Sequence, residues 1–129
     1  MPTPTLTLAL LAEPLALCRL ASDAPAPPWA AGGPFVSVTR TAAELSIVCA
    51  AAAVPEDAVA SRGWRALRVD GPLDLALVGV MASLAGPLAA ADVSIFPVAT
   101  YDTDWLLVPG AQVDAACAAL VAAGHVVRP

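Results

Sequence analysis

The chain has 129 residues, of which 59% are hydrophobic and 13% charged, and its 6 basic side chains stand against 11 acidic ones, which gives a formal net charge of −5. This length fits one globular domain or two very small ones, and the apolar content excludes an intrinsically disordered chain. Affinity for a phosphate backbone comes from clustered Lys and Arg, so the acidic balance argues against nucleic acid as a partner.

The cysteines, Cys18, Cys49 and Cys117, are odd in number, widely spaced and surrounded by apolar residues. This pattern is typical of small buried hydrophobic side chains rather than of a disulfide framework, so we expect a reducing compartment. Residues 1–12 contain an apolar stretch, but no basic residue precedes that stretch, as a secretory signal would require. The sequence therefore predicts a cytoplasmic protein.

One segment, residues 75–91, carries no charged side chain. It lies at the short end of the roughly 17 to 25 residues that a transmembrane helix needs, and its glycines, proline and alanines weaken its hydrophobicity. We therefore expect a buried helix here and no membrane span.

The chain opens with apolar residues that alternate with polar or small ones over residues 6–10 and again over 15–17. Glu13-Pro14 between them is a turn signal, so the pattern predicts two short strands that pair with each other. Residues 23–34, rich in proline, glycine and alanine around Trp29, predict a loop.

The alternation returns at residues 36–38 and 45–49, on either side of a short polar stretch, which predicts a β-hairpin. Residues 50–63 are rich in alanine and contain a proline and two acids, which favours a short helix followed by a linker. A new unit is expected to start near Trp64.

In that second unit, residues 64–69 predict a strand, and Gly71-Pro72 marks the start of a helix expected to run from Pro72 to about Ala91. Residues 93–98 predict the next strand, which Pro97 places at an edge or a bulge. After a turn at 101–103, residues 105–108 predict the hairpin partner of that strand.

The last elements are a helix over residues 112–123 and a short strand over 125–127. One helical stripe collects Val113, Cys117, Leu120 and Val121, and Gly124 follows as the C-terminal cap. The order of elements is β-α-β-β-α-β, which predicts an α+β fold of the ferredoxin-like type, with an antiparallel four-stranded sheet and two helices on one face.

The first half of the chain has features of a degenerate copy of the second. If Glu44 is aligned with Asp104, residues 35–38 fall over 95–98 and residues 45–48 over 105–108. Equal spacing suggests duplication, although two short hydrophobic hairpins can align this well by chance. The prediction is a degenerate N-terminal unit at 1–62 and a complete C-terminal domain at 63–129.

Signatures of catalysis are absent where the chemistry would need them. His125 is the only histidine, and its place among valines on a terminal strand is more typical of a structural residue than of a general base. One histidine and three scattered cysteines do not form a metal site, and there is no lysine for a Schiff base and no glycine-rich phosphate loop. We therefore expect no cofactor, no metal and no enzymatic activity.

Polar chemistry gathers in two loops, residues 70–74 and 100–104. A helix N-terminus after the first loop would present unpaired N–H groups to an anion, and the carboxylates of the second could hold an ammonium or a guanidinium. A free α-amino acid carries both charges. Each residue also has a structural explanation, because Asp74 can stabilise its own helix, Asp102 is a common turn residue and Gly71 can serve backbone geometry.

Residues 64–74, 84–96 and 99–108 together resemble the small stand-alone bacterial ACT-domain proteins, whose usual form of the last segment contains Ser-Thr-Tyr-Asp-Thr-Asp. These proteins are similar to the ACT pairs of the animal cytosolic arginine sensors. The resemblance covers residues 33–128 and is strongest over 64–108. It implies two tandem ACT units of ferredoxin-like fold that bind small ligands, usually amino acids, and do not catalyse.

In the arginine sensors the ligand lies beside the segments that match Asp74, Leu77, Thr100, Tyr101 and Asp104. The sensors have an acidic residue in place of Leu77 and a glycine in place of Asp74, so the resemblance does not carry arginine over as the ligand. Ala99 also replaces the serine that is common in the group. Together, the two polar loops and the resemblance predict the following ligand-binding residues: Asp70, Gly71, Leu73, Asp74, Leu77, Thr100, Tyr101, Asp102 and Asp104.

The sequence thus predicts a regulatory ACT-domain protein that binds an amino acid. We also expect a homodimer, because sheet edges in such modules are commonly shared and would otherwise stay open. The alternative is an interaction module that binds no metabolite and acts through a sheet edge or an apolar patch. An enzyme is the least favoured class.

Overall fold

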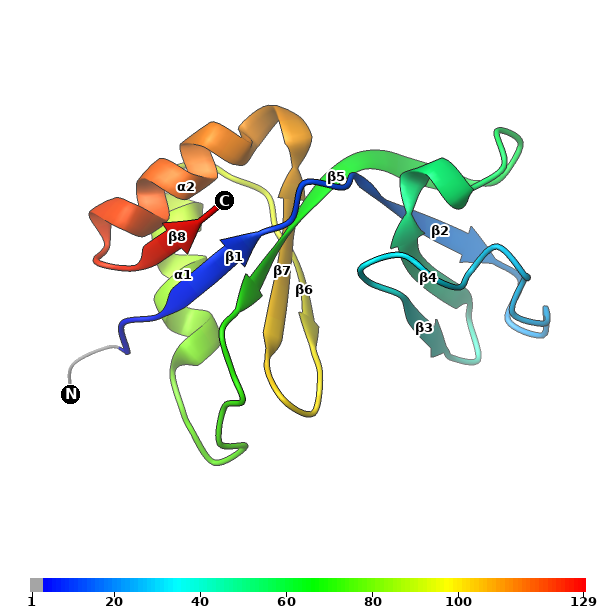
Figure 1. Ribbon diagram of the computed structural model, residues 1–129. Helices are drawn as coiled ribbons and strands as arrows, with labels where there is room; N and C mark the ends of the chain where they lie inside the picture. Colours follow the sequence, from blue (N-terminus) through cyan, green and yellow to red (C-terminus); the bar gives the residue numbers. More distant parts are fainter. Residues whose placement is uncertain (1–3) are drawn as a thin grey trace. The chain divides into compact units, whose positions relative to one another are not determined.

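The computed structural model describes residues 4–129 and divides into two compact units. One unit is formed by Glu13–Trp64, and the other by Arg65–Pro129 together with the residues up to Ala12. Figure 1 shows the elements of both. No helix in the described chain is both long enough and apolar enough to cross a bilayer.

The N-terminal unit is an antiparallel sheet of four strands in the order β3-β4-β2-β5. Its elements are β2 (Leu15–Leu20), β3 (Ser37–Arg40), β4 (Leu45–Ala50), the 3-10 helix η1 (Ala51–Ala53) and the first part of β5 (Ala60–Val69). A loop stands where the first helix of a ferredoxin-like unit would be, and η1 where the second would be. The unit therefore keeps the strand order of that fold without its helices.

The C-terminal unit has the sheet order β6-β7-β5-β1-β8 and two helices. Its elements are β1 (Thr7–Leu10), the later part of β5, α1 (Val80–Ala90), β6 (Phe96–Ala99), β7 (Asp104–Pro109), the 3-10 helix η2 (Gly110–Gln112), α2 (Val113–Ala122) and β8 (Val126–Arg128). Leucines and valines of alternate strand positions share one core with both helices, so α1 and α2 cover the same face of the sheet (Figure 1). The α+β ferredoxin-like prediction is confirmed.

The predicted pairing of the first two strands is wrong. β1 does not pair with β2; it lies between β5, to which it is antiparallel, and β8, to which it is parallel. The backbone N–H of Asp70 donates to the carbonyl of Thr7 at 2.8 Å, and Leu6 and Leu8 are buried in the C-terminal unit. Alternation decides which face of a strand is buried, but not which strand completes its hydrogen bonds.

This insertion changes two expectations. The C-terminal unit has five strands instead of four, and residues up to Ala12, which the sequence placed with the first unit, pack with the second. The expected linker before Trp64 is also partly strand, because β5 already begins at Ala60 and runs through the predicted boundary at 62/63.

The predicted start of the first helix at Pro72 is also wrong, because α1 begins at Val80. Asp74 closes a turn in this stretch: its side-chain Oδ1 accepts the N–H of Ala76 at 2.9 Å, and its carbonyl accepts the N–H of Leu77 at 2.9 Å. Gly79 then takes a φ of 84°, a left-handed conformation that favours glycine, immediately before the helix. Residues 70–79 are therefore a loop, which we call the long loop.

The two hairpin turns have the same local design. Thr41 and Thr100 each open a turn in which the backbone N–H of the threonine donates to the carbonyl of the residue three positions on, at 2.9 Å in both cases. In each turn the threonine hydroxyl also bonds that third residue. Thr41 thus corresponds to Thr100, one residue away from the alignment of Glu44 with Asp104.

Candidate functional site

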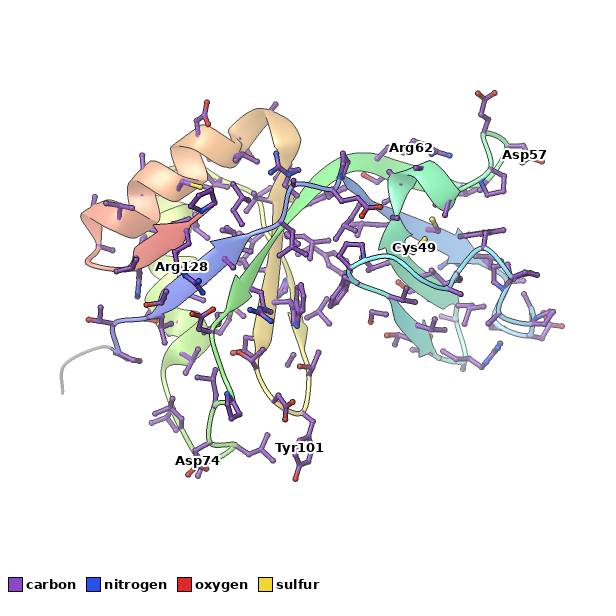
Figure 2. All side chains as sticks on the ribbon, in the orientation of Figure 1. Cys49, Asp57, Arg62, Asp74, Tyr101 and Arg128 are labelled. Carbon is purple, nitrogen blue, oxygen red and sulfur yellow. The ribbon has the colours of Figure 1, made fainter. Side chains whose placement is uncertain are left out.

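A cavity of about 360 Å³ lies between the long loop and the turn that joins β6 to β7. Figure 2 shows Asp74 and Tyr101 near the tips of these two loops, at the same end of the C-terminal unit. Seven of the predicted ligand-binding residues line this first cavity: Leu73, Asp74, Leu77, Thr100, Tyr101, Asp102 and Asp104.

The two loops are joined by hydrogen bonds. The backbone N–H of Leu73 donates to the carbonyl of Asp102 at 2.6 Å, and the hydroxyl of Thr103 donates to the carbonyl of Val69 at 2.6 Å. A Cβ on Gly71 would lie only 3.0 Å from the Cβ of Thr103 and 3.1 Å from the Asp102 carbonyl. Gly71 is therefore explained by this close approach, which was the structural alternative for it.

The charged side chains around the first cavity are all acidic: Asp74, Asp102 and Asp104. One carboxylate oxygen of Asp74 accepts the backbone N–H of Ala76, so part of the role of Asp74 is structural. In the described chain, no hydrogen bond or ion pair is found for the carboxylates of Asp102 and Asp104. These two groups remain available to a cation.

The lining of the first cavity also includes the start of α1, at Gly79, Val80 and Met81. No side chain caps this helix, its first turn holds no acid, and the first helical hydrogen bond runs from the N–H of Ser83 to the carbonyl of Gly79. The N–H groups before Ser83 therefore have no partner within the helix and present a partial positive charge. Sequence reasoning missed these three residues because it started the helix at Pro72; a glycine directly before an apolar helical run was the available signal.

Asp70 and Gly71 do not line the first cavity. They lie in a second cavity of about 520 Å³, which shares Thr100, Asp102 and Thr103 with the first. The carboxylate of Asp70 pairs with Arg128 of β8 at 2.5 Å and with Arg68 of β5 at 3.7 Å. The structure thus divides the nine predicted residues between two neighbouring cavities.

Metal-ligating side chains are scattered over residues 4–129, and His125 lies in the interior. No group of three or more His, Cys, Asp or Glu side chains gathers there in a way that could hold a metal ion. His125 is buried, accepts the N–H of Leu6 on Nδ1 at 3.1 Å, and places Nε2 2.9 Å from the carbonyl of Ser83. These contacts tie three elements together and leave no ring nitrogen for a substrate.

Comparison with known proteins gives matches for both units. The family model described as ACT domain matches residues 59–122, and a model of an N-terminal domain matches residues 13–57. The crystal structure of a protein from Agobacterium tumefaciens is 36% identical in sequence and covers 97% of this chain and 93% of that chain, with a TM-score of 0.92.

A second solved structure, the ligand-free regulatory subunit of aspartate kinase from Thermus thermophilus, is 12% identical and covers 87% of this chain and 93% of that one, with a TM-score of 0.56. This likeness concerns the fold. The human cytosolic arginine sensor for mTORC1, subunit 1, is 47% identical over 47 residues, which are 36% of this chain and 14% of the sensor. The match thus spans only a small part of that curated relative.

Proposed function

The chain belongs to the ACT-domain family, and from this premise we propose that it is a non-catalytic regulatory protein that binds an amino acid in the first cavity. ACT domains are commonly regulatory modules that bind amino acids, and one structural neighbour is the regulatory subunit of an enzyme. A cavity of about 360 Å³ lies within the range of roughly 300 to 1,000 Å³ that is usual for small-molecule sites.

One observation carries the proposal: two groups of opposite electrostatic character line the same cavity. The carboxylates of Asp102 and Asp104 attract an ammonium, and the uncapped start of α1 attracts a carboxylate. An α-amino acid presents both groups at adjacent atoms. Leu73 and Leu77 supply apolar wall for its side chain.

The charge of the side chains that line the first cavity also limits which amino acids we expect to bind there. Among residues 4–129, no basic side chain lines the first cavity, so a ligand side chain that adds a second negative charge would face three aspartates without a counter-ion. A neutral or basic amino acid therefore fits better than an acidic one. The sensor that is 47% identical to this chain over 47 residues is named for arginine, which is consistent with this preference.

A thermal-shift screen of the twenty amino acids at millimolar concentration tests the proposal. A true ligand at about a hundred times its dissociation constant stabilises the fold by roughly 2.7 kcal/mol. The melting temperature of the protein rises accordingly. Asp104→Asn should remove most of that shift, because it keeps the side-chain shape and removes the charge.

The matched control is Asp92→Asn, an exposed position of the same unit that lines neither cavity and whose φ of 61° asparagine also tolerates. This variant should keep the full shift. A shift that survives Asp104→Asn would place the ligand elsewhere, and no shift with any amino acid would overturn the proposal.

The second candidate function is an interaction module that binds no metabolite. An apolar groove of about 600 Å³ runs along α2 and β8, where Val121 is 56% exposed, and β8 ends the sheet of its unit. Open sheet edges and apolar patches commonly form protein–protein contacts. The homodimer expected from the sequence rests on the same features and stays a prediction. A screen without any amino-acid shift would favour this candidate.

A further inference from the structure

Two loops of the C-terminal unit expose large apolar side chains at their tips. In the long loop, Leu75, Leu77 and Val78 are 70%, 47% and 76% exposed, and Tyr101, in the turn that joins β6 to β7, is 81% exposed. No other leucine or aromatic residue of the described chain belongs to its exposed large hydrophobic side chains. We call these four residues the loop-tip surface.

The two tips form one connected surface. The backbone N–H of Leu73 donates to the carbonyl of Asp102 at 2.6 Å, which joins the long loop to the turn. All members of the loop-tip surface except Val78 line the first cavity, and Val78 directly follows one that does. Figure 2 shows Asp74 and Tyr101 at the same end of the unit.

A small ligand does not explain the whole loop-tip surface. An amino acid in the first cavity could contact the members that line it, but Val78 lines neither the first nor the second cavity. Exposed apolar side chains that gather at one place and are edged by polar ones are typical of protein contact sites. Tyrosine is also enriched among the residues that contribute most to protein–protein binding.

The charge around the loop-tip surface indicates what kind of partner fits it. Residues 70–79 and 99–104 contain aspartates and no basic residue, and Asp74 and Asp102 are exposed beside the apolar side chains. Acidic groups at the edge of a contact favour a partner with Lys or Arg and disfavour an acidic one.

The same charge argues against two other occupants. A second copy joined through this surface by two-fold symmetry would bring the aspartates of both copies together. An anionic lipid surface would be repelled by them, because such surfaces attract basic segments.

We propose that the loop-tip surface docks a partner protein through a segment whose apolar side chains are flanked by Lys or Arg. The apolar side chains of that segment cover Val78 and Tyr101, and its basic groups face Asp74 and Asp102. This inference goes beyond the proposed function, because contact with Val78 needs no amino acid in the first cavity.

Selection from a phage-displayed library of random peptides, with the full chain as bait, tests the surface. Binding of each selected peptide is then measured by fluorescence anisotropy. We expect the selected peptides to combine apolar residues with Lys or Arg, and their affinity to fall as the salt concentration rises. Selected peptides that are acidic or uncharged would overturn the chemistry of the partner, and a library that yields no binding peptide would overturn the docking surface.

Variants show whether the selected peptides bind at the loop tips. Val78→Ser and Tyr101→Ala should each weaken peptide binding at least about tenfold, and Asp102→Asn should reduce its salt dependence. The matched control is Val59→Ser, at a valine of the other unit that is 70% exposed, and it should bind the peptides like the parent. Peptide affinity that both Val78→Ser and Tyr101→Ala retain contradicts the proposal.

Val78→Ser also separates this surface from the amino-acid site. Because Val78 does not line the first cavity, the variant should keep any amino-acid thermal shift of the parent while it loses peptide affinity. Sedimentation of the full chain and its flotation with phosphatidylserine vesicles test the other occupants. Self-association or vesicle binding that Val78→Ser abolishes would assign the surface to a second copy or to a membrane and would overturn the proposal.

Discussion

At the scale of single residues, His125 shows how a lone polar side chain is used inside an apolar core. Its ring accepts the N–H of Leu6, next to β1, and lies 2.9 Å from the carbonyl of Ser83 in α1. Because Nδ1 accepts, Nε2 carries the proton that is donated to Ser83. The sequence predicted a structural role for this residue, but not its partners, which lie far from it in the chain.

We predict that His125→Ala lowers the free energy of unfolding by about 2 to 4 kcal/mol, because it leaves a buried N–H and a buried carbonyl without partners, each costing about 1 to 3 kcal/mol. Urea unfolding followed by circular dichroism measures this loss. The neighbouring Val126→Ala, at a side chain that is 52% exposed, should cost less than about 1 kcal/mol. Equal losses in the two variants would show that the ring contacts contribute nothing.

The predicted ligand residues show that the charge of a side chain does not by itself decide its neighbours. The sequence put Asp70, Asp74 and Asp102 into one site on the strength of their charge, and the structure gives them different neighbours. Asp70 pairs with Arg128, which lies at the far end of the sequence. No local pattern indicates such a partner, because an ion pair depends on which strands become adjacent.

At the scale of elements, β1 is the least local part of the fold. Its residues pair with β5 and β8, and Leu8, with Leu10 packed beside it, belongs to the core that both helices cover. Alternating leucines were sufficient to predict a strand there, and the short turn signal after it suggested the wrong neighbour. A strand between two others completes hydrogen bonds on both sides, so β1 holds the C-terminal unit together.

We predict that Leu8→Ala lowers the free energy of unfolding by about 2 to 5 kcal/mol, since Leu8 is fully buried and its removal leaves a cavity in that core. The matched control is Leu75→Ala, at a leucine that is 70% exposed, which should stay within about 0.5 kcal/mol of the parent. Chemical unfolding of both variants compares the two. A small loss for Leu8→Ala would mean that β1 is not an integral strand of its unit.

The start of α1 shows a second element-scale effect. Proline after glycine predicted the helix start at Pro72, yet the turn closed by Asp74 and the positive φ of Gly79 delay it to Val80. This delay places the free N–H groups of the helix at the first cavity instead of directly after β5. Side-chain bonds to the local backbone competed successfully with helix formation here.

At the scale of the whole molecule, two of the three predicted buried thiols, Cys18 and Cys49, lie in the interior, whereas Cys117 is only half-buried. Cys18 and Cys49 are 3% and 1% exposed, and no cysteine of the described chain is in a disulfide. Burial raises the pKa of the Cys18 thiol, although Arg62 opposes it, and burial together with the neighbouring Cys18 raises the pKa of Cys49. Burial and the charge of Asp114 raise the pKa of Cys117.

These shifts predict a loss of stability in alkali. Unfolded thiols release their protons near the ordinary pKa of 9.0, whereas the folded thiols keep theirs to higher pH. Over that interval the unfolded state binds fewer protons, so the free energy of unfolding falls as the pH rises through the ordinary value and towards the raised one. Below pH 8 the contribution is fully present and constant.

Urea unfolding at pH values from about 7 to 10 measures this dependence. The variant with all three cysteines changed to alanine should be less stable at every pH, because it leaves small cavities, but its stability should fall less steeply between pH 8 and 10. The same slope in the parent and the triple variant would assign the alkaline loss to other groups.

Local patterns in the chain were enough to predict the order of strands and helices, the hairpins β3–β4 and β6–β7, the burial of Cys18 and Cys49, and the two polar loops, since each depends on side chains within a few residues of one another. The partner of β1, the late start of α1 and the separation of the polar residues into two cavities emerged only on folding. These features depend on which distant backbone groups and charges come within hydrogen-bonding distance, and that is a property of the assembled sheet.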